Sequence, residues 1–244
     1  MNGKNEPCRL CLSEGEELRF SHILPEFLYK PLRDKKHRYI GLKRPQGAGT
    51  NRVLLQKGIR EYLLCGSCEQ LLAKYERYAA DVLRKLPDTS REPPGRVVHV
   101  TGVDYTKFKI FQLSILWRAG VSRHASFQEV NLGPHEAVLR RMVLEGDSGK
   151  PMDYGCVLIR TKGLETLNHI IQLPRRLRFF EHHAYGLTVF GMIWIFTVSS
   201  HSGQIHEKDS FLTGAGVLPI HVTKTTSEQF IANLATQGRR MGVI

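Results

Sequence analysis

Two Cys-x-x-Cys pairs constrain this chain more than any other feature of its sequence. The first pair is Cys8 and Cys11, the second is Cys65 and Cys68, and 53 residues lie between them. Two intervening residues close a tight turn that lets both thiolates of a pair bind one ion, and two such turns complete a tetrahedral shell. The spacing predicts one structural zinc held by all four cysteines, with the long insertion forming a structural unit of its own.

Other thiol chemistry fits these pairs less well. Two unrelated sets of reduced thiols are the alternative, and a redox Cys-x-x-Cys normally occurs once, at a helix start. The first ten residues, MNGKNEPCRL, carry neither an apolar stretch nor a small-residue cleavage site, so neither a signal peptide nor disulfides are expected. The fifth cysteine, Cys156, lies in an apolar segment and is predicted to be a small buried hydrophobe. A cytoplasmic location is the default expectation.

Length and composition predict a folded chain with a sizeable core. There are 244 residues, 41% of them apolar, which is enough for one large domain or two small ones. The longest apolar run, LTVFGMIWIFTV over 187–198, is too short to cross a bilayer as a helix, and we predict a buried strand there. The polar, proline-rich segment LPDTSREPPGR over 86–96 predicts a boundary near residue 93. We therefore expect two domains, 1–92 and 93–244.

Periodicity predicts an α+β fold. In the first domain a helix is expected over 67–86, opened by the second cysteine pair, and a shorter one from Pro25. In the second domain a strand over 96–103 is followed by helices over 104–122 and 134–146, and a last helix is expected over 226–241. Strands of a mainly antiparallel sheet are expected at 155–161, 177–186, 187–200 and 216–222. Within the helix expected over 104–122, we predict that Trp117 is a core tryptophan and that Arg118 beside it is solvated. Stacking or phosphate binding by this pair is the alternative.

The positive charge is concentrated in the insertion. The formal net charge is +12, and between Lys30 and Arg60 ten basic residues face one acid, Asp34. Such an excess favours an anionic partner such as DNA or RNA, although an acidic protein partner fits too, and a solvated loop is the alternative. No membrane partner is expected. Five basic side chains are predicted to contact nucleic-acid phosphates: Lys35, Lys36, Arg38, Lys43 and Arg44.

The order of these motifs resembles a known family. A Cys-x-x-Cys pair, a His-Ile-Leu-Pro over 22–25, the basic insertion, a Leu-Cys-x-x-Cys and a helix follow one another. This order is similar to that of the zinc-containing HNH endonucleases, which have a treble-clef, ββα-metal fold. The resemblance covers residues 8 to 80 and does not extend further. It implies a zinc-stabilised, HNH-like first domain. The α+β second domain rests on periodicity alone, and the sequence leaves its recognition role open.

The resemblance also implies catalytic roles. His22 matches the general base that activates water, beside a catalytic Mg²⁺ or Mn²⁺. Ser21 stands where the family has an acidic metal ligand, and Glu69 stands where it has a histidine. The family asparagine has two candidates, the distant Asn51 and the closer Glu61. A serine hydroxyl is a poor ligand for a hard cation, whereas the carboxylate of Glu69 is a good one.

Each of these residues also has a structural interpretation. His22 fits a histidine bonded to backbone, an extra zinc ligand or a nucleic-acid contact, and Glu69 fits an exposed carboxylate stabilised at a helix start. No Gly-rich phosphate loop, nucleophile elbow or dinucleotide fingerprint is present. The hypotheses are therefore a metal-dependent endonuclease with His22, Glu69 and Glu61 in its site, or an inactive zinc module that only binds nucleic acid. A zinc-stabilised protein-interaction adaptor is the third.

Overall fold

A computed structural model describes residues 3–30, 33, 39–43, 51–55, 58–89, 91–162, 171–179, 182–198 and 208–223, and for 39–43 and 51–55 it describes the backbone. Within these ranges three α-helices combine with one large sheet and two small ones. Short 3-10 turns lie at Gly3–Asn5, Glu26–Leu28, Ala125–Phe127 and Lys208–Ser210. The predicted α+β class with a mostly antiparallel sheet is confirmed. The helix expected over 226–241 lies outside the described residues.

The first part of the chain is built on a two-stranded ribbon and a helix. Strand β1 (Arg19–His22) pairs antiparallel with β4 (Arg60–Leu64), and α1 (Gly66–Arg84) follows directly. The insertion between them carries a small antiparallel sheet of its own, β2 (Tyr39–Lys43) and β3 (Asn51–Leu55). After Pro25, where a helix was predicted, the described residues form a 3-10 turn over Glu26–Leu28, and positions 31 and 32 lie outside the described residues.

The two other helices begin and end where their sequence signals predict. Helix α2 (Tyr105–Val121) starts after Asp104, whose carboxylate accepts a hydrogen bond from the backbone N–H of Lys107 at 3.0 Å. Helix α3 (His135–Glu145) follows Pro134 and ends at Gly146, whose φ of 73° lies in the left-handed region that glycine adopts without strain.

The large sheet has six strands in the order β5-β10-β6-β9-β8-β7. All described pairings are antiparallel except that of β10 with β6. The strands are β5 (Val97–Val100), β6 (Cys156–Thr161), β7 (Gln172–Phe179), β8 (His182–Val189), β9 (Met192–Thr197) and β10 (Leu218–Thr223).

The apolar run over 187–198 was predicted to be one buried strand. It instead forms a hairpin of β8 and β9. Val189 of β8 pairs with Met192 of β9, and the two residues between them, Phe190 and Gly191, both have positive φ, 56° and 68°. Positive φ at both positions is the geometry of the tight turn that joins antiparallel strands. Because an apolar phenylalanine occupies the first turn position, the sequence carries no polar turn signal there. The stretch over 177–186 likewise spans two strands, β7 and β8.

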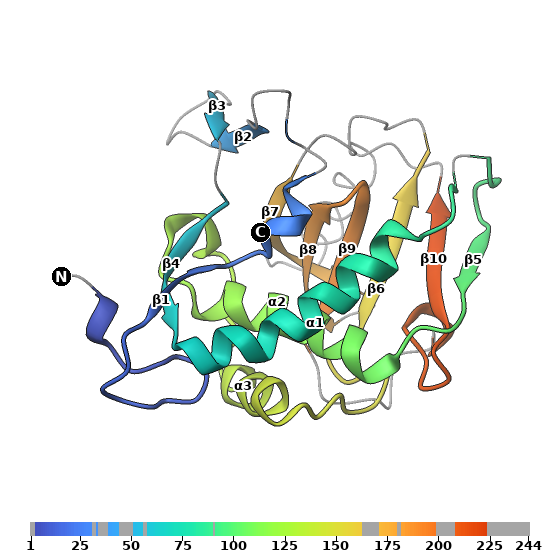
Figure 1. Cartoon of the computed structure of the whole chain (residues 1–244). Helices are drawn as coiled ribbons and strands as arrows, with labels where there is room; N and C mark the ends of the chain where they lie inside the picture. The colour runs from blue at the N-terminus through green and yellow to red at the C-terminus, as the bar shows by residue number, and fades with distance from the viewer. Residues whose placement is uncertain are drawn as a thin grey trace.

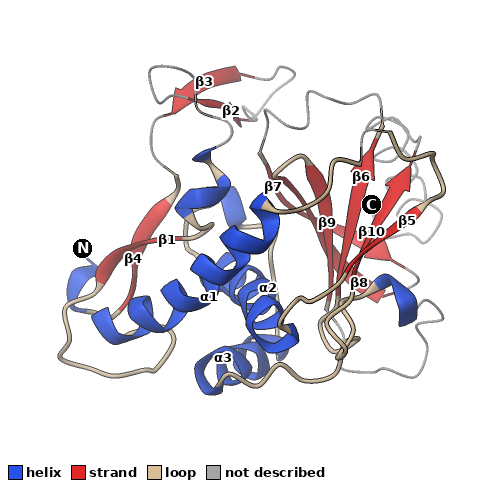
Figure 2. Cartoon of the chain, turned by 45° about the vertical axis from the view of Figure 1, so that its right-hand side comes forward, coloured by secondary structure: helices blue, strands red, loops and turns tan. Residues whose placement is uncertain are grey.

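Helix α2 lies between the sheet and α1 (Figures 1 and 2), with the β1–β4 ribbon on the far side of the helices from the sheet. Phe108 and Phe111 of α2 meet Trp194 of β9, with ring centroids 6.4 and 6.2 Å apart. One hydrophobic cluster runs from the cysteines through α1 and α2 to this face of the sheet. The segments on either side of residue 93 therefore share a core, and the domain boundary itself stays a prediction.

This layering corrects one expectation. Trp117 is fully buried, as predicted, but Arg118 is also buried, with 3% of its surface exposed, rather than solvated. A helix packed on two sides leaves Arg118 facing α1, where its Nη1 lies 2.8 Å from Oε1 of Glu76. Cys156 is buried at 2% exposure, as predicted. Among the described residues, no helix has the length and apolar character needed to span a membrane.

Candidate metal centre and adjoining pocket

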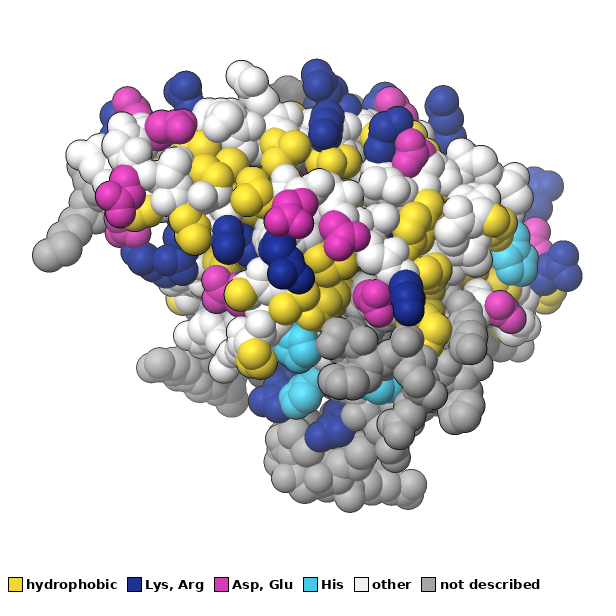
Figure 3. Space-filling model, turned by 90° about the horizontal axis from the view of Figure 1, so that it is seen from below, with side chains coloured by type: hydrophobic (Ala, Val, Ile, Leu, Met, Phe, Trp, Pro, Cys, Tyr) yellow, Lys and Arg dark blue, Asp and Glu magenta, His cyan; other side chains and the backbone are white. Residues whose placement is uncertain are grey.

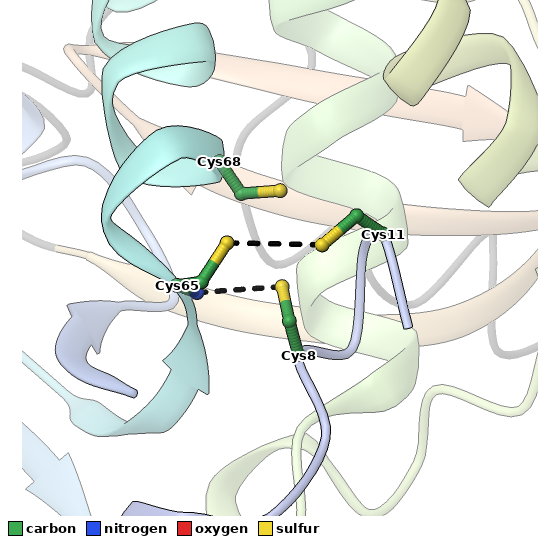
Figure 4. Close-up of side chains that lie close together, drawn as sticks. All are labelled: Cys8, Cys11, Cys65 and Cys68. Carbon is green, nitrogen blue, oxygen red and sulfur yellow. Dashed lines mark hydrogen bonds between the residues drawn. The ribbon is translucent and has the colours of Figure 1, made fainter. Parts of the chain in front are cut away.

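The four predicted cysteines meet at one point. Their Sγ atoms all lie within 4.8 Å of one another. Cys8 and Cys11 come from the turn before β1, Cys65 caps the start of α1, and Cys68 lies in the first turn of that helix. Figure 4 shows all four thiols pointing toward a common centre. The two pairs, far apart in sequence, therefore form one donor set, as their spacing predicted.

The geometry fits a single tetrahedral ion. Sulfurs placed about 2.3 Å from such an ion lie about 3.8 Å from one another, and Cys11 and Cys65 are 3.7 Å apart. The backbone N–H of Cys65 donates to the sulfur of Cys8 at 3.3 Å, and the hydroxyls of Ser13 and Ser67 lie 3.0 and 3.1 Å from the sulfurs of Cys11 and Cys65. Such outer contacts orient metal-binding thiolates. The set can hold one metal ion, and zinc is among the ions that suit four thiolates.

The close approach of the four thiols changes their protonation. The pKa of Cys8 is lowered to about 4, first by a hydrogen bond from Cys68 and then by backbone N–H donors from Cys11 and Cys65, against the opposing effect of burial. The pKa of Cys68 is raised, chiefly by its hydrogen bond with Cys8 and by burial. The sulfurs are thus close enough to share a proton, and thiolate is the form in which cysteine binds metal.

His22 is the last residue of β1, the strand that follows the first cysteine pair. Two arginines hold it in place. The strand register pairs it with Arg60 of β4, whose Nε donates a hydrogen bond to Nε2 of the His22 ring at 2.8 Å. Its backbone carbonyl accepts a hydrogen bond from Nη1 of Arg118 at 3.0 Å. Because Nε2 is the acceptor, the ring proton belongs on Nδ1.

The environment keeps the His22 ring neutral. Burial lowers the pKa of His22 to about 4, and the positive charge of Arg60 lowers it further in the same direction, while Glu26 opposes the shift. Packing around the ring is also close, because a Cβ at Gly58 would stand 3.1 Å from Cδ2 of His22 and 2.6 Å from the ring of Tyr29. At neutral pH the ring is therefore uncharged and able to accept a proton, and its position is fixed.

His22 and Glu69 line the same pocket. It has a volume of about 350 Å³, and its wall also includes Arg19, Phe20 and Gly66. Glu69 follows Cys68 in the first turn of α1, so the pocket adjoins the metal centre. The Nε of Arg19 lies 3.7 Å from where a Cβ on Gly66 would stand, which puts a guanidinium at the amino end of α1. The structure thus brings together two of the three residues predicted to be catalytic.

Glu61 lies elsewhere. Its carboxylate accepts hydrogen bonds from the hydroxyl of Ser122 at 3.1 Å and from the backbone N–H of Arg123 at 3.2 Å, both just after α2. It lines a second pocket of about 240 Å³, on which neither His22 nor Glu69 borders. Ser21, beside His22, is buried, and its hydroxyl donates to the carbonyl of Arg19 at 3.2 Å. The alternative family-asparagine candidate, Asn51, lies in β3 outside the described side chains.

The residues predicted to bind phosphates are not tested by the structure. Lys35, Lys36, Arg38 and Arg44 lie outside the described residues, and of Lys43, in β2, the structure gives the backbone. On the face seen in Figure 3, basic side chains are interspersed with acidic ones. The basic insertion therefore stays a predicted contact for nucleic acid. The described residues on the face in Figure 3 form no purely basic surface there.

Sequence reasoning missed the residues that hold His22 in place. Arg60 of β4 and Arg118 of α2 donate hydrogen bonds to it, and a Cβ at Gly58, before β4, would crowd its ring. The ten-against-one charge count treats Arg60 as one cation among many, and no spacing rule links position 118 to position 22. A prediction that β1 pairs with β4 could have identified Arg60, because residues opposite each other in a ribbon contact one another.

Comparison of the chain with protein-family models, with curated proteins and with solved structures finds no match. The resemblance to HNH endonucleases stays a prediction that rests on the motifs.

Proposed function

We propose that this chain is a zinc-containing protein that acts on nucleic acids, and that it hydrolyses phosphodiester bonds as a metal-dependent, HNH-like endonuclease. The observation that carries the proposal is that His22 and Glu69, far apart in sequence, line one pocket beside the four-cysteine centre. A neutral imidazole and a carboxylate on one wall are the groups that such a hydrolysis needs.

The proposal assigns zinc to the four cysteines and a treble clef to the segment around them. In support, the first pair lies in a turn, an antiparallel ribbon follows, and the second pair begins a helix. A two-stranded ribbon is marginal by itself in water. Zinc bound by four thiolates would stabilise this arrangement and would leave the chemistry to the adjoining pocket.

In the proposed reaction, His22 accepts a proton from the attacking water at Nε2, the ring nitrogen that lacks a proton. Glu69 supplies the carboxylate oxygen for a divalent cation, and Mg²⁺ or Mn²⁺ bound there would offset charge on the phosphoryl oxygens. Arg19 adds positive charge on the same wall. Arg60 occupies Nε2 of His22 at 2.8 Å, so it has to turn away before the base can act. A phosphate oxygen is a partner that would draw a guanidinium away.

A second candidate function is binding without cleavage. Two observations favour it: the hydroxyl of Ser21 is bound to backbone where the family has a carboxylate, and Arg60 blocks the base. In that case the basic insertion, with Lys35, Lys36 and Lys43, would contact phosphates while the zinc site serves stability. A protein-interaction adaptor with an acidic partner is the third candidate, and it rests on the charge of the insertion.

Cleavage assays separate the first two candidates. Purified protein is incubated with plasmid DNA and with structured RNA in Mg²⁺ or Mn²⁺, and we expect cutting that His22→Ala and Glu69→Gln abolish while the zinc content stays the same. Matched controls are His99→Ala and Glu145→Gln, both exposed in parts of the molecule that do not border the pocket. No cutting by the wild type with either metal would overturn the nuclease proposal.

Binding assays test the nucleic-acid role itself. Affinity for DNA or RNA should fall steeply as salt rises, because phosphate contacts release counterions. Replacing Lys35, Lys36 and Lys43 by alanine should weaken binding and reduce the salt dependence. Binding that does not respond to salt would favour a protein partner instead.

A further inference from the structure

An aromatic pair is exposed on the outer face of the β1–β4 ribbon. Phe20 and Tyr62 lie opposite each other in the strand register, with ring centroids 5.2 Å apart and planes tilted by 49°. They are 56% and 38% exposed and, with Leu12, are the large apolar side chains most exposed among those the structure describes. Burial in the core does not explain two aromatic rings at this position.

The pair stands between the two pockets. Phe20 borders both of them, the pocket of His22 and Glu69 on one side and the second pocket, with Tyr62, on the other. A flat ligand lying on Phe20 would therefore lie next to the candidate catalytic wall. Phe20 is also two residues before His22 on the same strand, so its side chain projects from the same face of the ribbon.

Guanidinium groups surround the rings. Arg19 borders the first pocket, and Arg9, Arg60 and Arg123 border the second. The two acids of the second pocket are occupied: Glu6 pairs with Arg123 at 2.8 Å, and Glu61 accepts the hydrogen bonds from the end of α2. Arg9 and Arg19 form no ion pair with any residue that the structure describes. Exposed aromatic faces with cations beside them are the combination that binds unpaired nucleotides, whose bases stack while their phosphates meet the cations.

We propose that Phe20 and Tyr62 form a stacking site for unpaired bases, so that the substrate of the adjoining pocket is a single-stranded or locally unpaired segment of DNA or RNA. The inference rests on the proposed function and narrows its substrate class. A duplex keeps its bases stacked on one another and offers the rings no free base face. The stacked base would lie on Phe20, with its flanking phosphates near Arg19 on one side and Arg9 on the other.

Binding to three probes tests the proposal. Fluorescence anisotropy measures the affinity of the whole chain for a labelled oligothymidylate, for an abasic strand of the same length and for a duplex. The abasic strand keeps every phosphate but has no base to stack. We expect the wild type to bind oligothymidylate about tenfold more tightly than the abasic strand. Phe20→Ala and Tyr62→Ala should remove that preference and leave binding to the abasic strand unchanged. Oligouridylate in place of oligothymidylate shows whether the site prefers RNA.

Two controls accompany the variants. Tyr62→Phe keeps the ring and should keep the preference, and Leu12→Ala removes an exposed apolar side chain that borders neither pocket and should have no effect. Equal zinc content and equal melting curves establish that Phe20→Ala and Tyr62→Ala are folded.

The failures of the two proposals are distinguishable. If the wild type binds the abasic strand as tightly as oligothymidylate, or if Phe20→Ala weakens both alike, the stacking site is wrong while a nucleic-acid role survives. Tightest binding to the duplex would also overturn the stacking site alone. If no probe binds at low salt, the proposed nucleic-acid function fails together with the stacking site.

Discussion

The segment before residue 93 and the sheet that follows it are held together in different ways. The first has a two-stranded ribbon and one helix arranged around four sulfurs, whereas the second has six strands packed on α2 through an aromatic cluster. All six residues of β9 are buried. The unusual side chains, His22, Glu69 and the exposed Phe20, lie in the first segment. A region held by a metal ion, as we propose for the first segment, needs fewer apolar residues for stability, which leaves more of its positions for chemistry.

Metal removal should separate the two regions most strongly. A structural zinc in a small domain contributes on the order of 10 kcal/mol of binding free energy at neutral pH. We expect a chelator, or Cys65→Ser with Cys68→Ser, to abolish hydrogen-exchange protection in β1, β4 and the first turn of α1, while β6 and β9 stay protected. Cys156→Ala is the matched control, because this buried cysteine lies in β6 of the large sheet and is not one of the four clustered cysteines. The replacement should leave the metal bound. Simultaneous loss of protection in β9 would instead mean that the shared core unfolds as one unit.

Truncation of Trp194 should destabilise the large sheet and leave the metal-binding region intact. Its ring contacts Phe108, Phe111 and Phe196, and it is fully buried. Replacing a buried tryptophan by alanine costs roughly 3–5 kcal/mol, measurable by urea unfolding followed by circular dichroism. We expect Trp194→Ala to keep its metal under native conditions, and Trp194→Phe to cost less. A Trp194→Ala protein that loses metal in native buffer would contradict the separation of the two regions.

Arg118 connects the regions, so its replacement should affect both. Arg118→Met leaves the Glu76 carboxylate, 25% exposed, without its ion-pair partner and the carbonyl of His22 without its donor. Removing one member of a buried pair costs roughly 3 kcal/mol. The expected results are a lower urea midpoint and a shifted ring signal of His22 in NMR spectra. Arg118→Lys, which keeps the charge, should lose less stability. An unchanged His22 signal in Arg118→Met would show that the arginine is purely structural.

The smallest expected effect is the pH response of His22. Its pKa in the folded protein, about 4, lies below the ordinary value of 6.5 because of burial and Arg60. The unfolded chain therefore takes up a proton between pH 6.5 and 4 that the folded chain does not, so this group lowers the stability as pH falls through that window and has no effect above it. NMR titration should give a midpoint near pH 4, and Arg60→Gln should raise it. A midpoint near 6.5 in the wild type would refute the buried, arginine-facing environment.

Local patterns in the sequence predicted the metal cluster and most of the helices, while the contacts that complete the pocket could not be predicted. Cysteine spacing follows from the geometry of one ion, and the ends of α3 follow from Pro134 and Gly146. The β8–β9 turn was missed because Phe190 hides it in an apolar run. Arg118 was expected in solvent because the packing of α2 between two layers is a tertiary property. The meeting of His22 with Glu69 depends on the β1–β4 register, which no local pattern specifies.

The hydrogen bond from Arg118 to the carbonyl of His22 joins residues 96 positions apart. During synthesis the ribosome releases all four cysteines well before it releases α2, and the earlier part of a chain generally folds first. The metal centre can thus assemble on the nascent chain while the strand that carries His22 still lacks its anchor. The pocket reaches its final geometry when α2 docks, so any activity of this site begins only after synthesis has passed the end of α2 at Val121.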